Sequence, residues 1–305
     1  MAAAIIDGRR LAAQVRSECR ERVQALVSAR ITPQLAVVLA GDEPASRIYV
    51  QNKLKACEEV GVASTLHALP HDAAEEDVLS LIRALNADPH VHGILVQLPL
   101  PPQISAQRVI FTIEATKDVD GFHLYNVGAL AAGEPTFAPC TPQGVMRLLD
   151  AAAIPIEGQH AVVVGASNIV GKPMAMMLMR RHATVTVCHV KTRDLRAHTL
   201  QADILVVAAG RPGLIKADMV RPGGTVIDVG INRLPDGSIV GDVDFAAVAT
   251  KAGHITPVPG GVGPMTIAML MLNTVEAAAA QSKFRRTWQC SEEWHAQNAD
   301  LQKAR

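Results

Sequence analysis

Residues 160–173 read HAVVVGASNIVGKP, and this stretch decides the fold class expected for the chain. It begins with a mostly apolar, β-branched run that predicts a buried strand. A glycine-rich turn follows and leads into a Met-rich helix expected to end near Arg181. This order is typical of a dinucleotide site, because glycines let the backbone approach a pyrophosphate and the helix N-terminus supplies aligned N–H groups. The spacing is G-x-S-x-x-x-G instead of G-x-G-x-x-G, so a tight β–α turn without a ligand is the alternative.

The strands expected around this turn bear on the identity of the nucleotide. They are predicted at residues 184–189, 203–208 and 224–229, after a helix at residues 141–153. The first of them ends in CHVKTR, residues 188–193, where Asp or Glu usually meets a cofactor with a free 2′-hydroxyl. No acidic residue occurs there before Asp194, and Lys191 and Arg193 would suit a 2′-phosphate instead. NADP is therefore favoured over NAD, unless both cations are ordinary surface charges.

A second informative stretch is PASRIYVQNKLK, residues 44–55. Tyr49 and Lys53 lie four residues apart in a helix-friendly sequence, so both side chains should leave the same face of a helix. The phenol offers a flat surface for a conjugated ligand, and burial can tune the proton affinity of the lysine. A buried strand predicted at residues 35–40 would place the pair at the carboxyl end of a strand, where open α/β sheets keep their sites. On spacing alone, an ordinary amphipathic helix with a solvated Lys53 is the alternative.

Strands and helices alternate in the first half of the chain, which implies a parallel sheet. The strands are predicted at residues 35–40, 62–69 and 92–98. Asp7 can cap a helix at residues 9–30. Residues 117–140 are expected to form a long loop, and long loops in compact chains are usually functional. The last long helix, residues 264–281, is expected to leave the second unit and pack back on the first.

Composition excludes several classes of protein. The chain has 305 residues, 49% of them hydrophobic and 19% charged, which is enough for two globular domains. Its formal net charge is zero, so no basic excess favours nucleic acid as a partner. The five cysteines form no CxxC pair, which suits a reducing compartment without a zinc site, and we expect no bound metal. With no segment expected to cross a membrane, the predicted location is the cytoplasm.

Longer motifs occur in a fixed order along the chain. They are residues 46–55 (SRIYVQNKLK), 93–99 (GILVQLP), 117–121 (KDVDG), 139–142 (PCTP), 165–173 (GASNIVGKP), 227–232 (IDVGIN) and 256–266 (TPVPGGVGPMT). Together they resemble the bifunctional methylenetetrahydrofolate dehydrogenase/methenyltetrahydrofolate cyclohydrolase family, whose glycine loop is itself G-x-S-x-x-x-G. The resemblance covers nearly the whole chain, from about residue 5 to about residue 280.

The resemblance implies an α/β fold with two α/β domains around a cleft, the second a Rossmann-like doubly wound parallel sheet, and a homodimer. Residues 1–140 would form the folate-binding catalytic domain, completed by the helix at residues 264–281. Residues 141–263 would form the NAD(P)-binding domain. Residues 282–305 would form a polar C-terminal tail, about which the resemblance says nothing.

The implied reactions are oxidation of 5,10-methylenetetrahydrofolate to the methenyl form with NADP, and hydrolysis of that form to 10-formyltetrahydrofolate. Lys53 is the expected general acid/base, held by a hydrogen bond to Gln97, and Tyr49 would stack on the aminobenzoyl ring. Because the methenyl product is a cation, Lys53 should be neutral or screened. Asp120 would accept two hydrogen bonds from the pterin edge, whereas Asp118 is expected to be structural.

The site residues implied by the resemblance fall into two sets. The substrate contacts are Tyr49, Gln97, Leu98, Asp120, Pro259, Gly260 and Gly261. The cofactor contacts are Gly165, Ala166, Ser167, Ile169, Gly171, His189, Lys191, Thr192, Arg193 and Ile231. Many family members carry Arg at the position of Ala166 and Ser or Arg at that of Val190, both linked to the 2′-phosphate. Lys191 or Arg193 must replace them if NADP is the cofactor, and NAD stays possible.

Three rival functions are weighed against this one. A monofunctional dehydrogenase would lack the hydrolase step, but Lys53, Gln97 and Asp120 are all present. Another two-domain NAD(P) oxidoreductase, such as an amino-acid dehydrogenase, is disfavoured by the PGGVGPMT run at residues 259–266. A non-catalytic nucleotide-binding regulatory protein would be favoured by loss of Lys53 or of the glycine loop, and both are intact.

Overall fold

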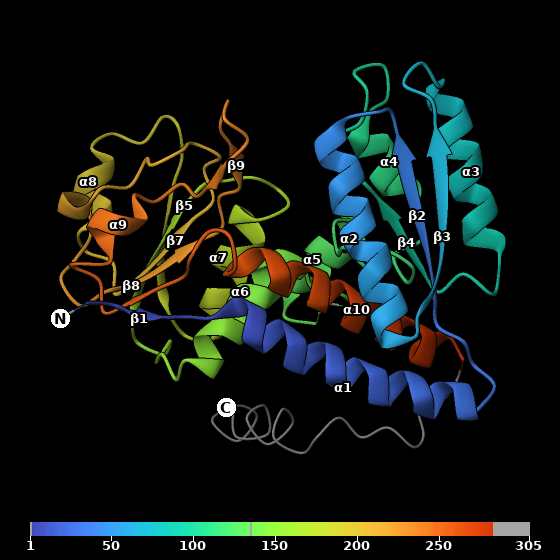
Figure 1. Cartoon of the computed structure of the whole chain (residues 1–305), viewed down its shortest axis with the longest axis horizontal. Helices are drawn as coiled ribbons and strands as arrows, with labels where there is room; N and C mark the ends of the chain where they lie inside the picture. The colour runs from blue at the N-terminus through green and yellow to red at the C-terminus, as the bar shows by residue number, and fades with distance from the viewer. Residues whose placement is uncertain (1, 135, 283–305) are drawn as a thin grey trace.

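The computed structural model describes residues 2–134 and 136–282 and contains two parallel sheets (Figure 1). The first sheet has the strand order β3-β2-β4. Its strands are β2 (Gln34–Ala40), β3 (Ala63–Leu69) and β4 (Gly93–Val96). Val38 of β2 is level with His67 of β3 and with Val96 of β4. The three strands predicted in the first half of the chain are therefore confirmed, and they are parallel.

Helices cover both faces of this three-stranded sheet, and they bury β2 on both sides. Its helices are α1 (Gly8–Ser28), α2 (Pro44–Val60), α3 (Glu75–Ala87) and α4 (Ala106–Thr112). Leu35 and Val37 join an apolar cluster with residues of α1 and α2. Ala36 and Val38 point to the opposite face and join a second cluster with residues of α3 and α4. The near-continuous apolar sequence of β2 follows from this two-sided burial.

The ends of α1 and α2 follow from their capping residues. The Asp7 side chain accepts hydrogen bonds from the backbone N–H groups of Arg9 and Arg10, which fixes the start of α1 as predicted. Gly61 ends α2 with a φ of 85°, a left-handed conformation that costs glycine little. Asp7 thus fixes the start of α1, and Gly61 fixes the end of α2, the helix that carries Tyr49 and Lys53.

The second sheet has six parallel strands in the order β1-β11-β8-β7-β5-β6. They are β1 (Ala4–Ile5), β5 (His160–Val164), β6 (Thr184–Cys188), β7 (Ile204–Val207), β8 (Thr225–Asp228) and β11 (His254–Ile255). From β5 onward the chain first moves outward to β6 and then returns to β7 on the other side. The order therefore reverses between β5 and β7, which is the position where doubly wound sheets bind their ligands.

Helices also lie on both faces of the six-stranded sheet, as expected for a doubly wound fold. They are α6 (Cys140–Ala151), α7 (Gly171–Arg180), η1 (Ala217–Met219), α8 (Leu195–Thr199) and α9 (Phe245–Val248). Val163 of β5 lies in the cluster that contains residues of α6 and α7. Val164 lies in the opposite cluster, with residues near α8, η1 and α9. A short antiparallel hairpin, β9 (Asn232–Arg233) and β10 (Ile239–Val240), follows β8.

The last described helix, α10 (Val262–Gln281), joins the two domains. It runs along α1 and α6 beneath the first sheet, so the prediction that it packs back on the first unit is confirmed (Figure 1). Its buried residues share one apolar cluster with both sheets. By length and composition α10 could cross a membrane, but its most apolar window is 67% buried in the protein, as in a core helix.

Two sequence expectations need correction. Residues 117–140 are not simply a loop, because they contain α5 (Leu124–Ala132). His123 caps its start by accepting a hydrogen bond from Tyr125 N, and Gly133 ends it with a φ of 95°. The glycines that suggested a loop include Gly128, which lies inside the helix.

The predicted boundary near residue 141 does not separate the two sheets completely. Ala4 and Ile5 form β1, which pairs with His254 and Ile255 at the edge of the six-stranded sheet. The chain therefore starts in the second domain and enters the first through α1. The proposed polar tail lies outside the described residues from position 283 onward.

Candidate active site

The Tyr49–Lys53 face of α2 meets the end of β4. Lys53 Nζ donates a hydrogen bond of 3.0 Å to Gln97 Oε1, as expected for the residue just after β4. Gln97 is almost completely buried, and its Nε2 donates to the carbonyl oxygen of Leu98 at 2.6 Å. Both ends of the amide are thus occupied, so its oxygen is held toward Lys53.

Asp120 completes this polar cluster. Burial raises its pKa to about 6, and the nearby Lys53 ammonium limits the rise. Asp118 raises the pKa of Asp120 further, while a hydrogen bond from the thiol of Cys140 lowers it. Lys53 and Asp120 are therefore close enough to interact electrostatically, and a charged Lys53 would be screened by this carboxylate. The cluster offers an amine, a carboxylate and a fixed amide at one place.

The other polar residues of the KDVDG motif are structural, as expected for Asp118. Its carboxylate accepts hydrogen bonds from His123 N at 2.7 Å and Asn126 Nδ2 at 2.8 Å, which ties it to the start of α5. Lys117 Nζ donates to three carbonyl groups at the end of α3. These contacts fix the loop on both sides of Asp120.

Asn273 on α10 is a supporting residue that the sequence did not reveal. Its Nδ2 donates to the carbonyl oxygens of Val119 at 2.8 Å and Ala138 at 3.2 Å. It therefore ties Val119, the residue immediately before Asp120, to α10. A polar residue in the otherwise apolar α10 was the available indication, because a buried amide must find partners.

The glycine loop after β5, which we call the cradle, packs too closely on neighbouring backbone to accept side chains at Gly165 and Gly171. A Cβ on Gly165 would lie 2.2 Å from the carbonyl oxygen of Ala208, and one on Gly171 would lie 2.0 Å from that of Gly165. Ser167 Oγ accepts hydrogen bonds from Val170 N and Gly171 N, which shapes the turn. The backbone can thus approach a ligand closely at the N-terminus of α7, so the residues present fit a dinucleotide.

The loop after β6 lies beside this cradle and presents the predicted cations. His189 N donates to Thr192 Oγ1 at 2.8 Å, and Lys191 N donates to His189 Nδ1 at 3.1 Å. The side chains of Lys191 and Arg193 are exposed, and Val190 is 88% exposed. The loop is therefore held by its own backbone contacts, which leaves both cations available to a phosphate.

The run at residues 259–263 forms a backbone wall at the start of α10. Gly260 has a φ of 119°, and a Cβ on Gly261 would lie 2.7 Å from the Pro257 carbonyl oxygen. Gly8, at the start of α1, packs against this wall, since its own Cβ would lie 1.8 Å from the Gly261 carbonyl oxygen. Three closely packed glycines leave this wall no freedom to take larger side chains.

The hairpin after β8 brings the second domain close to the first. A Cβ on Gly263 would lie 3.6 Å from Ile231 Cδ1, so Ile231 borders the start of α10. Burial raises the pKa of Tyr49, and the Arg233 guanidinium partly offsets this rise. Arg233 of β9 is therefore near enough to Tyr49 of α2 to influence it electrostatically.

Asp228 and Asp242 are further residues of this region that sequence reasoning missed as a pair. Asp242 is fully buried and accepts hydrogen bonds from the backbone N–H groups of Ala209, Gly210 and Arg211. Asp228 ends β8, and burial raises its pKa to about 6 while three backbone donors oppose the rise. An acidic residue at the end of an apolar strand was the available indication.

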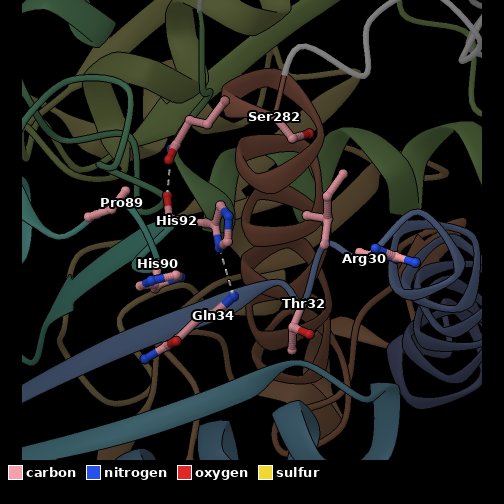
Figure 2. A pocket seen from close by; sticks show the side chains of 9 residues that line it. Arg30, Thr32, Gln34, Pro89, His90, His92 and Ser282 are labelled. Atoms are coloured by element: carbon pink, nitrogen blue, oxygen red, sulfur yellow. Dashed lines mark hydrogen bonds between the residues drawn. The ribbon is translucent and has the colours of Figure 1, made fainter.

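One cavity lies away from this site. It has a volume of about 340 Å³ and lies at the beginning of β2 and β4. Its lining includes Gln34, His90 and His92 (Figure 2). The predicted residues lie at the other end of these strands. His92 Nδ1 accepts from Gln34 N and Gln281 Nε2 donates to the His92 carbonyl, so His92 serves the fold. Within residues 2–134 and 136–282, no cluster of three His, Cys, Asp or Glu side chains could hold a metal.

A glycine cradle at the strand-order reversal of the second domain, together with a Lys/Gln/Asp cluster in the first domain, defines an NAD(P)-dependent oxidoreductase of the two-domain type. Sequence profiles make the assignment specific. The catalytic domain of tetrahydrofolate dehydrogenase/cyclohydrolase matches residues 6–120, and the NAD(P)-binding domain of the same family matches residues 139–282. The chain belongs to the tetrahydrofolate dehydrogenase/cyclohydrolase family.

Individual relatives agree with this assignment. The Bifunctional protein FolD of Nitrosospira multiformis is 61% identical over 91% of this chain and 96% of its own length. The solved structure of the bifunctional enzyme FolD from Campylobacter jejuni is 54% identical, covers 92% of this chain and 99% of its own, and has a TM-score of 0.90. The Trypanosoma brucei FolD structure, a complex with NADP and inhibitor, is 37% identical over 92% and 99%, with a TM-score of 0.88.

Proposed function

We propose that this chain catalyses both NADP-dependent oxidation of 5,10-methylenetetrahydrofolate and hydrolysis of the methenyl product to 10-formyltetrahydrofolate. The observation that supports this proposal most directly is the 3.0 Å hydrogen bond between Lys53 Nζ and Gln97 Oε1, with Asp120 close by. A dehydrogenase needs no such amine–amide pair to expel hydride, whereas a hydrolase needs a group that moves protons. The arrangement therefore supports two activities in preference to a monofunctional dehydrogenase.

The residues of the second domain would hold the dinucleotide. Gly165, Ser167 and Gly171 would receive its pyrophosphate on the backbone at the start of α7. Ile231 would border the nicotinamide end, next to the wall at residues 259–261. When bound, NADP accepts the hydride from the carbon between the two folate nitrogens. The protein's contribution to this step is alignment, which can supply several kcal/mol.

The residues of the first domain would hold the folate. Asp120 would accept hydrogen bonds from the pterin edge, and Tyr49 would stack on the aminobenzoyl ring. The nitrogen lone pairs of the substrate expel hydride without a strong base, so the main electrostatic demand is tolerance of the cationic product. The Asp120 carboxylate meets that demand by screening a charged Lys53.

Hydrolysis requires proton movement at the cationic carbon. A water molecule adds to this carbon and must lose a proton, and one folate nitrogen must gain a proton before the C–N bond breaks. Lys53 would carry the proton between these atoms as the general acid/base. Gln97 would hold Lys53 Nζ in position, since both ends of its amide are occupied.

The test is a spectrophotometric assay of purified protein with methylenetetrahydrofolate and either NADP or NAD. Reduced nicotinamide and the methenyl compound are followed separately. We expect reduction with little methenyl accumulation, and faster decay of added methenyl substrate than in buffer. Reduction without accelerated decay would assign the protein to monofunctional dehydrogenases. No reduction with either cofactor would favour a regulatory nucleotide-binding protein.

We further propose that Lys191 and Arg193 select NADP in place of the missing arginine at Ala166. The double variant Lys191→Ala/Arg193→Ala should raise the KM for NADP at least tenfold and leave the KM for NAD unchanged, because only the former carries the 2′-phosphate. Arg196→Ala is the matched control, because it removes a cation of the nearby α8 that is already paired with Asp218 of η1. An unchanged preference in the double variant would refute the assignment.

We also propose a cytoplasmic homodimer. Among the described strands, β3 forms an edge of the first sheet, and its Leu66 is 43% exposed. An exposed edge strand favours pairing with a second copy. The four described cysteines are buried and free, which suits a reducing compartment. Light scattering should give the mass of two chains, and Leu66→Lys should lower it; a wild-type monomer would refute the dimer.

A further inference from the structure

The loops that follow β7 and β8 are held by one carboxylate. Asp242 Oδ2 accepts hydrogen bonds from Ala209 N at 2.6 Å and Gly210 N at 2.9 Å, in the loop after β7. Its Oδ1 accepts from Arg211 N at 2.8 Å and from Asn232 Nδ2 at 2.8 Å, the latter after β8. Four donors on one fully buried carboxylate leave neither oxygen free.

A second carboxylate holds Asp242 in turn. Asp228 Oδ1 accepts hydrogen bonds from Asp242 N at 3.0 Å and Gly230 N at 2.9 Å, and its Oδ2 accepts from Val243 N at 2.9 Å. Thr256 Oγ1 accepts from Asp228 N at 2.8 Å. The two carboxylates and the backbone between them form one connected network, which we call the Asp228–Asp242 pair.

Glycines are required around this pair. A Cβ on Gly230 would lie 2.3 Å from Asp242 Oδ1, and a Cβ on Gly241 would lie 1.8 Å from Asp228 Oδ2. The backbone at Gly230 and Gly241 therefore lies too close to the two carboxylates for any side chain to fit at these positions. Because the packing is this close, a shift of either carboxylate would also shift the two loops.

Both loops border the places where the dinucleotide would lie. The first begins at Ala208, whose carbonyl oxygen is the atom that a Cβ on Gly165 would meet at 2.2 Å. The second contains Ile231, which lies 3.6 Å from the Cβ position of Gly263 at the start of α10. One loop therefore lies beside the pyrophosphate cradle and the other beside the wall at residues 259–263.

We propose that the Asp228–Asp242 pair is a positioning unit for the nicotinamide half of the cofactor. The inference rests on the proposed function, because it assumes that the cradle binds NADP. Both aspartates would act through the two loops, because their oxygens are occupied by protein N–H groups. They fix the spacing between the loop at residues 208–211 and the loop at residues 230–232, and this spacing sets where the nicotinamide can lie relative to the folate.

The test uses Asp242→Asn in the full chain and measures both activities separately. An amide has one oxygen and directs N–H bonds at backbone donors, so two of the four hydrogen bonds must be lost. We expect the KM for NADP to rise at least tenfold, while hydrolysis of added methenyl substrate, which needs no NADP, stays within twofold of wild type. A general loss of structure would lower both activities together.

Asp244→Asn is the matched control, because Asp244 lies two residues away, caps α9 and pairs with Lys216 at 3.2 Å without contacting either loop. It should leave the KM for NADP unchanged. An unchanged KM in Asp242→Asn, or an equal fall of both activities, would overturn the inference.

If Asp242→Asn does not fold, Asn232→Ala is the second variant, because it removes one of the four donors to Asp242. It should raise the KM for NADP about threefold. An unchanged KM in this variant would also overturn the inference. Absence of dehydrogenase activity in the wild-type protein would instead refute the proposed function itself.

Discussion

Lys53 and Asp120 oppose each other in charge across the candidate site. Lys53 is held by Gln97, and its ammonium lowers the pKa of Asp120 against the stronger effect of burial. Burial of either charge therefore costs less free energy when the other charge is present. Substitution of either residue changes both the chemistry of the site and the electrostatic balance of the fold.

Replacement of Lys53 tests the acid/base assignment. Lys53→Ala should lower cyclohydrolase turnover at least a hundredfold, because positioned acid/base groups contribute about 10²–10⁴ in rate. The dehydrogenase should partly survive, since hydride expulsion needs no base. Lys55→Ala, two residues away and exposed, is the control and should change neither activity. Both rates follow from the methenyl and nicotinamide absorbances; full hydrolysis by Lys53→Ala would contradict the assignment.

Replacement of Asp120 separates function from stability. Its pKa of about 6 exceeds the usual 3.8, so the folded protein binds more protons than the unfolded chain between these pH values. The free energy of unfolding therefore falls as the pH rises from about 4 to 6. Asp120→Asn removes this buried charge and should raise the free energy of unfolding at pH 7 by about 1–3 kcal/mol.

The same variant should bind folate at least tenfold more weakly, because its amide meets pterin donors with an N–H group. Denaturant unfolding at pH 7 and pH 4.5 measures the first effect, and the wild-type and variant values should converge at the lower pH. Equal stability at pH 7 would show that burial does not raise the pKa as stated. Unchanged folate affinity would remove Asp120 from the substrate site.

At the scale of elements, the turn between β5 and α7 depends on its glycines. Gly171→Ala would force a methyl group to within 2.0 Å of the Gly165 carbonyl oxygen, so the cradle must open. We expect loss of NADP binding and of dehydrogenase activity, with cyclohydrolase activity retained. Gly128→Ala is the matched control, because it lies in α5 with no atom within 4 Å of its Cβ position. Titration of NADP by fluorescence measures the difference, and normal binding by Gly171→Ala would exclude the cradle as the dinucleotide site.

Most elements could be predicted from the sequence because their patterns are local. The strand at residues 160–164 and the Asp7 and Gly61 caps need only neighbouring residues to be recognised. The helix α5 was missed because its glycines outweighed the apolar sequence around them, and its cap comes from a histidine, a residue seldom used in that role. The pairing of β1 with β11 could not be predicted, since two-residue strands have no periodicity and their partner lies 250 residues away.

The candidate site was predicted in part for the same reason. The helical spacing placed Lys53 beside Tyr49, but the roles expected of Lys53 and Gln97 came from the family resemblance, since a lysine on a helix and an amide at a strand end are common. Asn273 and Asp242 were missed because their partners are backbone groups far away in sequence. Their hydrogen bonds depend on how α10 and the β7 loop pack, and no local pattern records that packing.

At the scale of the whole molecule, α10 packs against both domains. Its buried face shares a single apolar cluster with both sheets. We therefore expect one calorimetric unfolding transition instead of two. Met269→Ala, which truncates a fully buried residue of α10, should lower the free energy of unfolding by about 2–5 kcal/mol without splitting the transition.

Met179→Ala is the matched control, because Met179 is 54% exposed on α7 and should change stability little. Differential scanning calorimetry distinguishes these outcomes. Two separate transitions in the wild-type protein would show that the domains unfold independently despite α10.

The position of α10 also has a consequence for biosynthesis. Chains usually begin to fold from the N-terminus while they are still being translated. Here the apolar stripe of α1, with Val15, Cys19 and Val23, packs on a helix that starts at Val262. The first domain is therefore synthesised long before its last helix leaves the ribosome. During that interval the apolar stripe of α1 lacks the helix that covers it in the folded protein, and this exposure favours aggregation of the nascent chain.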